Sequence, residues 1–345
     1  MQIYGGDRTV VYRQLTPSAK EVKTFFAVVP EGMRSLVLAE IADCVYAQSQ
    51  SLLLYIAKSQ TEASNIKEQL SFYAPQHQVI SIPEWDCLPN DRISPSREVM
   101  AQRIEGLSQL SHLLRKGNQN STIIITTVNN LLQRLPVKEF IGHLTCTLQQ
   151  KQQINIQSFL NQLHDWGFMR LETVTQPGEY AIRGSIIDFF PPGQLNPIRL
   201  DLDDIIIDHI RTFDPLTQRT IAEIKDITLK PAGEIFLNSG SIENFRTAYR
   251  QIFQVTGNND PLYEAISNKR PYVGMEHWLP LFYSTMVTIF DYLPKNCLMI
   301  FDSQTLDLAK SRLATITDYY QARSQPGRWQ GQTVYHPAAE LFIFG

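Results

Sequence analysis

The sequence predicts an α/β fold in which a parallel-sheet domain is interrupted by a smaller, β-rich α+β domain. In the first 140 residues, short apolar runs alternate with helix patterns, an order typical of βαβ units. From residue 141 to about 229, strand patterns and tight turns dominate, and after Pro231 helices and strands alternate again. We therefore expect an α/β domain at 1–140, an inserted domain at 141–229, and a segment at 230–345 that completes the α/β domain.

The composition is that of a globular protein. The chain has 345 residues, of which 43% are apolar and 19% are charged, and this length suggests two or three domains. It lacks an apolar run of about 18 residues and a basic start followed by an apolar core, so we expect no membrane span and no signal peptide. Its four cysteines lie far apart, which predicts no metal site and a reducing cytoplasm. The net charge of −3 argues against nucleic-acid binding through bulk positive charge.

The α/β domain is predicted from four apolar runs and three helix patterns. The helix patterns cover residues 34–46, 60–72 and 96–115. The third begins with Ser94 or Ser96 as its N-cap and stops at Gly117. The apolar runs predict buried strands at residues 25–29, 51–57, 78–82 and 121–127.

The later elements are predicted in the same way. A hairpin is expected from residues 198–202, a turn at Asp203-Asp204, and residues 205–213. We also expect helices at 155–166, 242–253 and 306–321, and strands at 286–290 and 297–301. The apolar residues 341–345 end the chain without a polar tail, which indicates a fragment of a longer protein.

The stretch Gly178–Pro192 is the strongest candidate for a partner surface. It is predicted to be a turn and then one strand, in which Gly184 marks a bulge or a close backbone approach. Alternation places Arg183, Ile187 and Phe189 on one face. A cation beside an aliphatic and an aromatic side chain suits a binding surface. The alternative is an ordinary half-buried strand whose Arg183 meets a neighbouring carboxylate.

A nucleotide site is not expected in the α/β domain. A phosphate loop requires a Gly-Lys pair whose backbone and lysine neutralise phosphate charge, and this dipeptide is absent. The corresponding position, between the strand at 25–29 and the next helix, contains Gly32, Arg34 and Ser35 but no lysine, and Glu31 would repel phosphate. We interpret these residues as a degenerate, non-functional phosphate loop and expect no ATP hydrolysis by this chain.

Other catalytic or metal-binding patterns are weak or absent. Asp201, Asp203 and Asp204 lie close together, but without the spacing of a calcium loop they favour a solvated hairpin turn. Trp85 could stack a nucleic-acid base, although its proline-bounded segment favours a loop anchor. We find no catalytic residue and no metal ligand, and expect no cofactor. The sequence therefore favours a binding module over an enzyme.

Four stretches in register resemble the bacterial transcription-repair coupling factors. Residues 82–95 with Arg103 are similar to the family's W-E-x-L-P-Y-D-x-x-S-P … R segment, and residues 178–191 to its G-E-Y-A-x-R-G-x-x-x-D-x-F-P segment. Residues 199–220 resemble the segment that follows, and residues 274–282 resemble G-I-E-x-W-x-P-L-F. The excision-nuclease subunit UvrB shares the second motif and the F-D-P-L-T element, so a UvrB-like subunit in damage recognition is the alternative.

The resemblance implies a UvrB-like module without ATPase activity. Its α/β domain, in parts called 1a and 1b, would be interrupted by a domain 2 that recruits UvrA. The family's UvrA contacts carry over onto Arg170, Arg183 and Ile187, and strand periodicity adds Phe189. The parent would be an ATP-driven DNA translocase that binds RNA polymerase, DNA, ATP and Mg²⁺ through C-terminal domains. One of those domains would mask domain 2. The remaining hypothesis is a DNA-binding domain without a protein partner.

Overall fold

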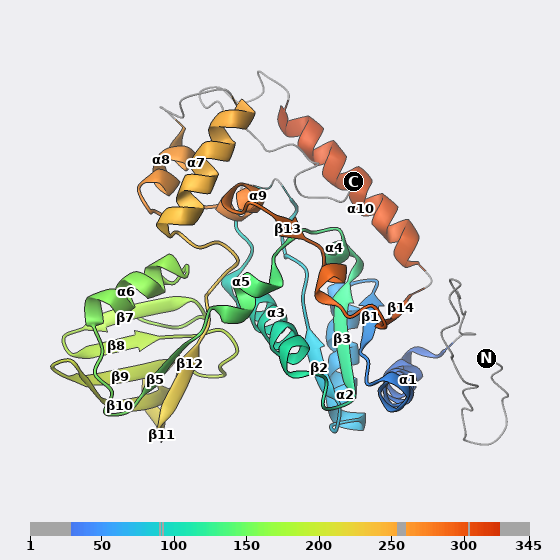
Figure 1. Cartoon of the computed structure of the whole chain (residues 1–345), viewed down its shortest axis with the longest axis horizontal. Helices are drawn as coiled ribbons and strands as arrows, with labels where there is room; N and C mark the ends of the chain where they lie inside the picture. The colour runs from blue at the N-terminus through green and yellow to red at the C-terminus, as the bar shows by residue number, and fades with distance from the viewer. Residues whose placement is uncertain (1–28, 90, 92, 254–259, 303, 325–345) are drawn as a thin grey trace.

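A parallel four-stranded sheet organises the first part of the molecule (Figure 1). The computed structural model describes residues 29–89, 91, 93–253, 260–302 and 304–324. The order of the strands is β14-β1-β3-β2, and every neighbouring pair is parallel. The strands are β1 (Leu53–Ala57), β2 (Gln78–Ser81), β3 (Thr122–Thr127) and β14 (Leu298–Phe301). β14 follows the inserted sheet in the chain, so the last segment returns to complete the first sheet.

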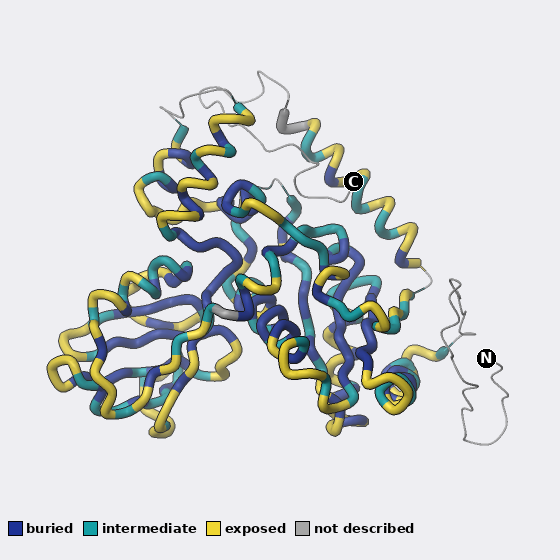
Figure 2. Tube along the Cα trace, viewed as in Figure 1, coloured by how far each residue is buried: buried dark blue, intermediate teal, exposed yellow. Residues whose placement is uncertain are grey.

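Helices cover both faces of this sheet because its strands are apolar on both sides, as a parallel sheet requires. α1 (Arg34–Ser49) and α2 (Gln60–Tyr73) pack on the face that carries Leu53 and Tyr55. α3 (Arg97–Lys116) packs on the face that carries Leu54. The interior strands of the sheet are buried along their whole length (Figure 2).

The three helices expected in this part are confirmed to within a few residues. α3 begins after Ser96, whose hydroxyl accepts a hydrogen bond from the backbone N–H of Val99 at 3.3 Å. Gly117, at a φ of +83°, ends it. The strand expected at 25–29 lies outside the described residues.

The inserted part is a second sheet of six strands. Its order is β11-β10-β9-β8-β7-β6, antiparallel except for the parallel pair β6-β7. α6 (Ile156–Asp165) covers one face, where Phe159 contacts Phe189 with ring centroids 5.8 Å apart. The strands are β6 (Met169–Arg170), β7 (Glu179–Arg183), β8 (Ile186–Phe189), β9 (Ile198–Asp203), β10 (Ile206–Phe213) and β11 (Thr220–Ile224).

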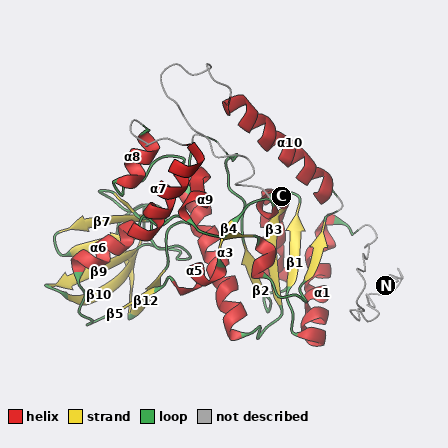
Figure 3. Ribbon diagram, turned by 45° about the horizontal axis from the view of Figure 1, so that its top comes forward, coloured by secondary structure: helices red, strands yellow, loops and turns green. Residues whose placement is uncertain are grey.

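Smaller elements join the two sheets and finish the α/β part. A two-stranded ribbon of β5 (Cys146–Gln149) and β12 (Asp226–Leu229) brackets the second sheet in the chain, and β4 (Leu135–Pro136) pairs with β13 (Met286–Val287). The helices are α4 (Val128–Leu131), α5 (Lys138–His143), α7 (Ser239–Phe253), α8 (Pro261–Ser267), α9 (Leu279–Phe282) and α10 (Thr305–Ser324), with 3₁₀ turns η1 (Glu31–Met33), η2 (Met275–Trp278) and η3 (Ile289–Tyr292). α10 lies beside the first sheet, away from the second (Figure 3).

The α/β fold class with a separate β-rich sheet is confirmed, and two strand predictions are wrong. The strand expected at 286–290 is only Met286–Val287, because a 3₁₀ turn capped by Thr288 follows it. The single strand expected after Gly178 is a hairpin of β7 and β8. Gly184, at a φ of +61°, makes the tight reversal with Ser185, so it is a turn residue and not a bulge. The domain boundaries at 140/141 and 229/230 stay predictions.

Two ion pairs join α3 to the second sheet and to the chain that leaves the inserted part. Arg97 donates to the buried Glu179 of β7 at 2.6 Å, and Lys230 contacts Glu105 at 2.6 Å. Glu179 also accepts hydrogen bonds from the backbone N–H groups of Thr175 and Gln176. These contacts link the inserted part of the chain to α3.

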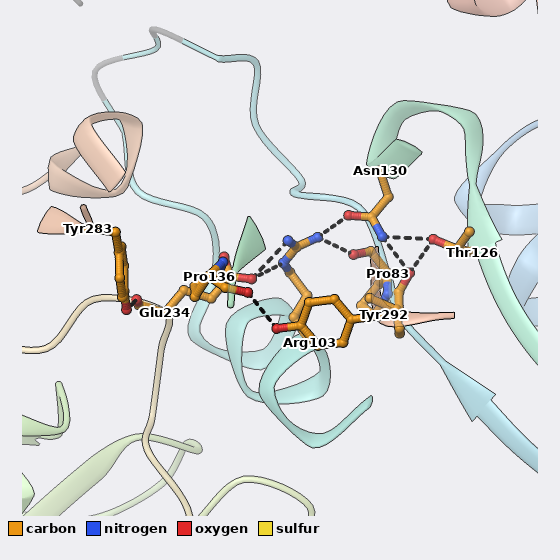
Figure 4. A network of polar contacts seen from close by, with 9 residues as sticks. Pro83, Arg103, Thr126, Asn130, Pro136, Glu234, Tyr283 and Tyr292 are labelled. Carbon is orange, nitrogen blue, oxygen red and sulfur yellow. Dashed lines mark hydrogen bonds and ion pairs between the residues drawn. The ribbon is translucent and has the colours of Figure 1, made fainter. Parts of the chain in front are cut away.

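A buried arginine connects α3 to the chain that leaves the inserted part (Figure 4). Arg103 is fully buried and donates to Glu234 at 2.9 and 3.2 Å and to the carbonyl oxygen of Pro83 at 2.7 Å. It also donates to the side-chain oxygen of Asn130, and the side-chain nitrogen of Asn130 donates to the hydroxyl oxygen of Thr126 at 2.8 Å. Each guanidinium nitrogen of Arg103 therefore has a hydrogen-bond acceptor, and a charge can be buried only when it is paired and hydrogen-bonded in this way.

Candidate partner-binding face of the second sheet

The strand register divides the second sheet into an apolar and a polar face. Paired residues of neighbouring strands project from the same side of a sheet. One row joins Ala181, Asp188, Arg199 and Arg211 across β7 to β10. A second row, which includes Phe189, projects from the other face, and α6 covers that face. We call the first side the polar face, which carries Arg183, Asp188, Arg199, Asp201, His209, Arg211 and Glu223.

A buried carboxylate lies at the centre of the polar face. Arg199 donates to both oxygens of Asp188 at 2.7 and 2.9 Å, and Arg183 donates to one of them at 3.2 Å. This hydrogen bonding to Asp188 raises the pKa of Arg199. The Arg199 guanidinium also lies 4.5 Å from the ring centroid of Phe213, a cation–π contact that fixes its plane. Two guanidinium groups share one carboxylate, so one positive charge is left in excess.

Arg183 is the outer member of this group. Its side chain is 48% exposed, whereas that of Asp188 is 1% exposed. The alternative interpretation, that Arg183 meets a neighbouring carboxylate, is confirmed. However, Asp188 is already paired with Arg199, so the charge of Arg183 is only partly compensated. A half-exposed, pre-oriented guanidinium is suited to bind a second carboxylate.

Ile187 and Phe189 do not share the exposed face of Arg183. They are 1% and 0% exposed and belong to the core beneath α6. The prediction of an exposed row is wrong because the hairpin pairs Arg183 with Ile186, which reverses the odd–even assignment after the turn. The same reversal brings Asp188 onto the face of Arg183. The side chains of Ile187 and Phe189 are therefore inaccessible to a partner.

Arg170 also lies apart from Arg183. It is exposed on β6 and is in register with Tyr180, so it projects from the side opposite to the polar face. Burial raises the pKa of Tyr180, and the nearby charge of Arg170 opposes this rise. The structure therefore does not bring the two predicted arginines together on one face.

The other charged residues of the polar face contact one another in pairs. Arg211 forms an ion pair with Asp201. His209 contacts Glu223 at 2.7 Å, and this hydrogen bond lowers the pKa of Glu223. Sequence reasoning missed these residues, although the alternation of charged and apolar residues in the predicted hairpin was a signal for them. Arg183 is therefore the half-exposed arginine of this face that shares its carboxylate with a second arginine.

Carboxylates of the same chain pair with the arginine of the predicted degenerate phosphate loop. Arg34 forms ion pairs with Glu62 and with Asp302, the latter at 3.0 Å. Ser35 is buried at the start of α1, and a side chain at Gly32 would meet nothing within 4 Å. The predicted cation is therefore compensated by two carboxylates, which disfavour an incoming phosphate.

The motif segments 82–95 and 274–282 pack on each other. Ser94 donates to Glu276 at 2.6 Å and accepts from the backbone N–H of Gly274 at 2.9 Å. Burial raises the pKa of Glu276. Trp85 is buried against His277, with ring centroids 5.6 Å apart, so its interpretation as a loop anchor is confirmed. These motif residues hold the α/β part together.

Within the described residues, no group of three or more His, Cys, Asp or Glu side chains is arranged to hold a metal ion. The helices in the same part of the chain include none that is long and apolar enough to cross a membrane.

Comparison with known proteins supports the expected resemblance. The UvrB interaction domain family matches residues 146–235, which contain the second sheet. The transcription-repair-coupling factor of Haemophilus influenzae is 33% identical over 294 residues, which cover 85% of this chain and 25% of that protein. The Escherichia coli factor is 31% identical over 265 residues, covering 76% of this chain and 22% of its own length, and the Rickettsia bellii factor is 30% identical over 293 residues, covering 85% and 26%.

The predicted resemblance to the UvrB-homology module of transcription-repair coupling factors is thereby confirmed. This chain is similar to these factors over most of its own length and spans about a quarter of theirs.

Proposed function

We propose that this chain is a non-catalytic adaptor that recruits UvrA in transcription-coupled repair. The observation that carries the proposal is the half-exposed guanidinium of Arg183, whose charge is not fully balanced by the shared Asp188. It lies in the segment that matches the UvrB interaction domain. A carboxylate on UvrA would give Arg183 a partner that it does not share with Arg199.

The fold favours binding because it has already oriented the guanidinium. Asp188 is anchored by two hydrogen bonds from Arg199, so its position does not depend on Arg183. Arg183 consequently loses less side-chain freedom on binding than a free surface arginine would. Truncation of such an anchor typically costs about 2 kcal/mol or more of binding free energy.

The remaining functional expectations belong to the same proposal. The chain binds no nucleotide, because Arg34 is paired with Glu62 and Asp302 where a phosphate would have to lie. The parent is a cytoplasmic ATP-driven DNA translocase whose contacts with RNA polymerase, DNA, ATP and Mg²⁺ lie in other domains. One of those domains masks the UvrA-binding part. The pairing of Arg34 disfavours the UvrB-like alternative, which needs a working phosphate loop.

Calorimetric titration of purified UvrA with this chain tests the proposal. Wild type is expected to bind, and Arg183→Ala is expected to weaken binding about tenfold or more. Arg270→Ala is the matched control, because Arg270 is an exposed arginine paired with one carboxylate, Glu264, outside the second sheet. Equal affinities for the wild type and Arg183→Ala would remove Arg183 from the interface.

A further inference from the structure

A rigid turn beside the polar face presents a fully exposed leucine. Leu216 is 89% exposed, yet its turn is ordered by side-chain hydrogen bonds. One oxygen of Asp214 accepts from the backbone N–H of Leu216 at 3.0 Å and of Thr217 at 2.6 Å, and from the Thr217 hydroxyl at 2.9 Å. Leu216 is therefore displayed by a fixed backbone and is not part of a loose loop.

Gln218 fastens this turn to the polar face. Its backbone N–H donates to the carbonyl oxygen of Asp214 at 2.8 Å, and its side-chain amide donates to that of Val174 at 3.0 Å. Val174 belongs to a small buried cluster with Ala181 and Phe213, both of which lie on the side of the sheet that carries the polar face. The turn thus folds back over this side and does not extend away from the sheet.

One arginine joins the turn to Arg183. The Arg199 guanidinium donates to the carbonyl oxygen of Gln218 at 3.3 Å and, through its other nitrogens, to Asp188. Asp188 in turn accepts from Arg183. The backbone of the Leu216 turn and the Arg183 guanidinium are therefore linked through one partly buried hydrogen-bond network, which fixes their relative positions before any partner binds.

We infer that Leu216 and Arg183 form one binding surface, which takes a part of UvrA that offers a carboxylate beside an apolar socket. The inference rests on the proposed function. The half-exposed guanidinium of Arg183, which shares its only described carboxylate with Arg199, suits a partner carboxylate. The exposed side chain of Leu216 suits an apolar socket. Burial of an apolar side chain on a pre-ordered turn stabilises a complex with little loss of backbone freedom. Arginine is among the residue types enriched at the positions that carry most of the binding energy of an interface.

The test is a titration of UvrA with Leu216→Ala and with Leu306→Ala. Leu306 is the matched control because it is 71% exposed and lies on α10, which packs beside the first sheet. Leu216→Ala is expected to weaken binding about tenfold, and Leu306→Ala to leave it unchanged. A photo-crosslinking residue in place of Leu216 is expected to attach to UvrA, and the same residue in place of Leu306 is not.

The outcomes separate this inference from the proposed function. If Arg183→Ala weakens binding while Leu216→Ala leaves it unchanged, the inference is overturned and the recruitment of UvrA stands. If the wild-type chain does not bind UvrA, both are overturned. Loss of binding in Leu216→Ala with an unchanged melting temperature supports the inference, because an exposed leucine contributes little to the fold.

Discussion

Replacement of Glu234 by glutamine is expected to destabilise the protein strongly. Glu234 is the only carboxylate among the described partners of Arg103, which is fully buried and 2.9 Å from it at the closest approach. Glutamine keeps the size of the side chain but leaves the guanidinium charge uncompensated. Breaking a buried pair in this way costs about 3–5 kcal/mol of the free energy of unfolding.

Urea unfolding followed by tryptophan fluorescence measures this loss. Trp85 reports on the site directly, since the Arg103 guanidinium lies 5.9 Å from its ring centroid. With an m-value of about 3 kcal/mol/M, the unfolding midpoint falls by about 1–1.7 M urea. Glu105→Gln is the control, because its pair with Lys230 is partly exposed and contributes about 1 kcal/mol or less. A Glu234→Gln midpoint equal to that of Glu105→Gln would refute the reasoning.

Two further outcomes are expected for the α/β part. Burial raises the pKa of the Glu276 carboxyl above its ordinary value of 4.5. Between these two pKa values the folded state keeps a proton that the unfolded state has released. The free energy of unfolding therefore falls as the pH rises from 4.5 toward the folded-state pKa. Glu276→Gln removes this pH dependence. Urea unfolding at several pH values is expected to show that the free energy of unfolding of the variant, relative to the wild type, increases with pH. A difference between the two proteins that does not change with pH would contradict the burial argument. Millimolar MgATP is expected to leave the melting temperature unchanged, because Arg34 is paired with Glu62 and Asp302. A concentration-dependent rise in melting temperature would show that the loop binds nucleotide.

Local signals in the sequence were sufficient for most helices and for the fold class. Apolar residues four apart, such as Ile66 and Leu70, and the cap at Ser96 report the backbone state of their own segment. The hairpin of β9 and β10 is local in the same sense. Such features need no knowledge of distant partners, and the structure matches them closely.

The error in the candidate site came from one turn. Gly184-Ser185 fits a two-residue hairpin turn as well as a bulge, and treating it as a bulge predicts one continuous strand where the structure has two. Periodicity alone therefore placed Ile187 and Phe189 beside Arg183 and left Asp188 on the other face. A two-residue reversal exchanges these assignments, because Arg183 then pairs with Ile186. A glycine at positive φ is the physical cause.

Long-range pairs were beyond the sequence for a different reason. Arg103 and Glu234 are 131 residues apart, and Arg97 meets Glu179 at a separation of 82. Nothing in the local pattern around an arginine identifies which distant carboxylate the fold brings to it. The resemblance to a known family located the arginine motif but did not specify its partner.

The most direct test of the account is the ratio of the UvrA dissociation constants of Arg183→Ala and the wild-type chain. The substitution is expected to raise the dissociation constant about tenfold or more. It should change the melting temperature little, because Arg199 continues to satisfy Asp188 through two hydrogen bonds. A ratio near one, with UvrA bound normally, would contradict the assignment of the polar face as the UvrA-binding surface.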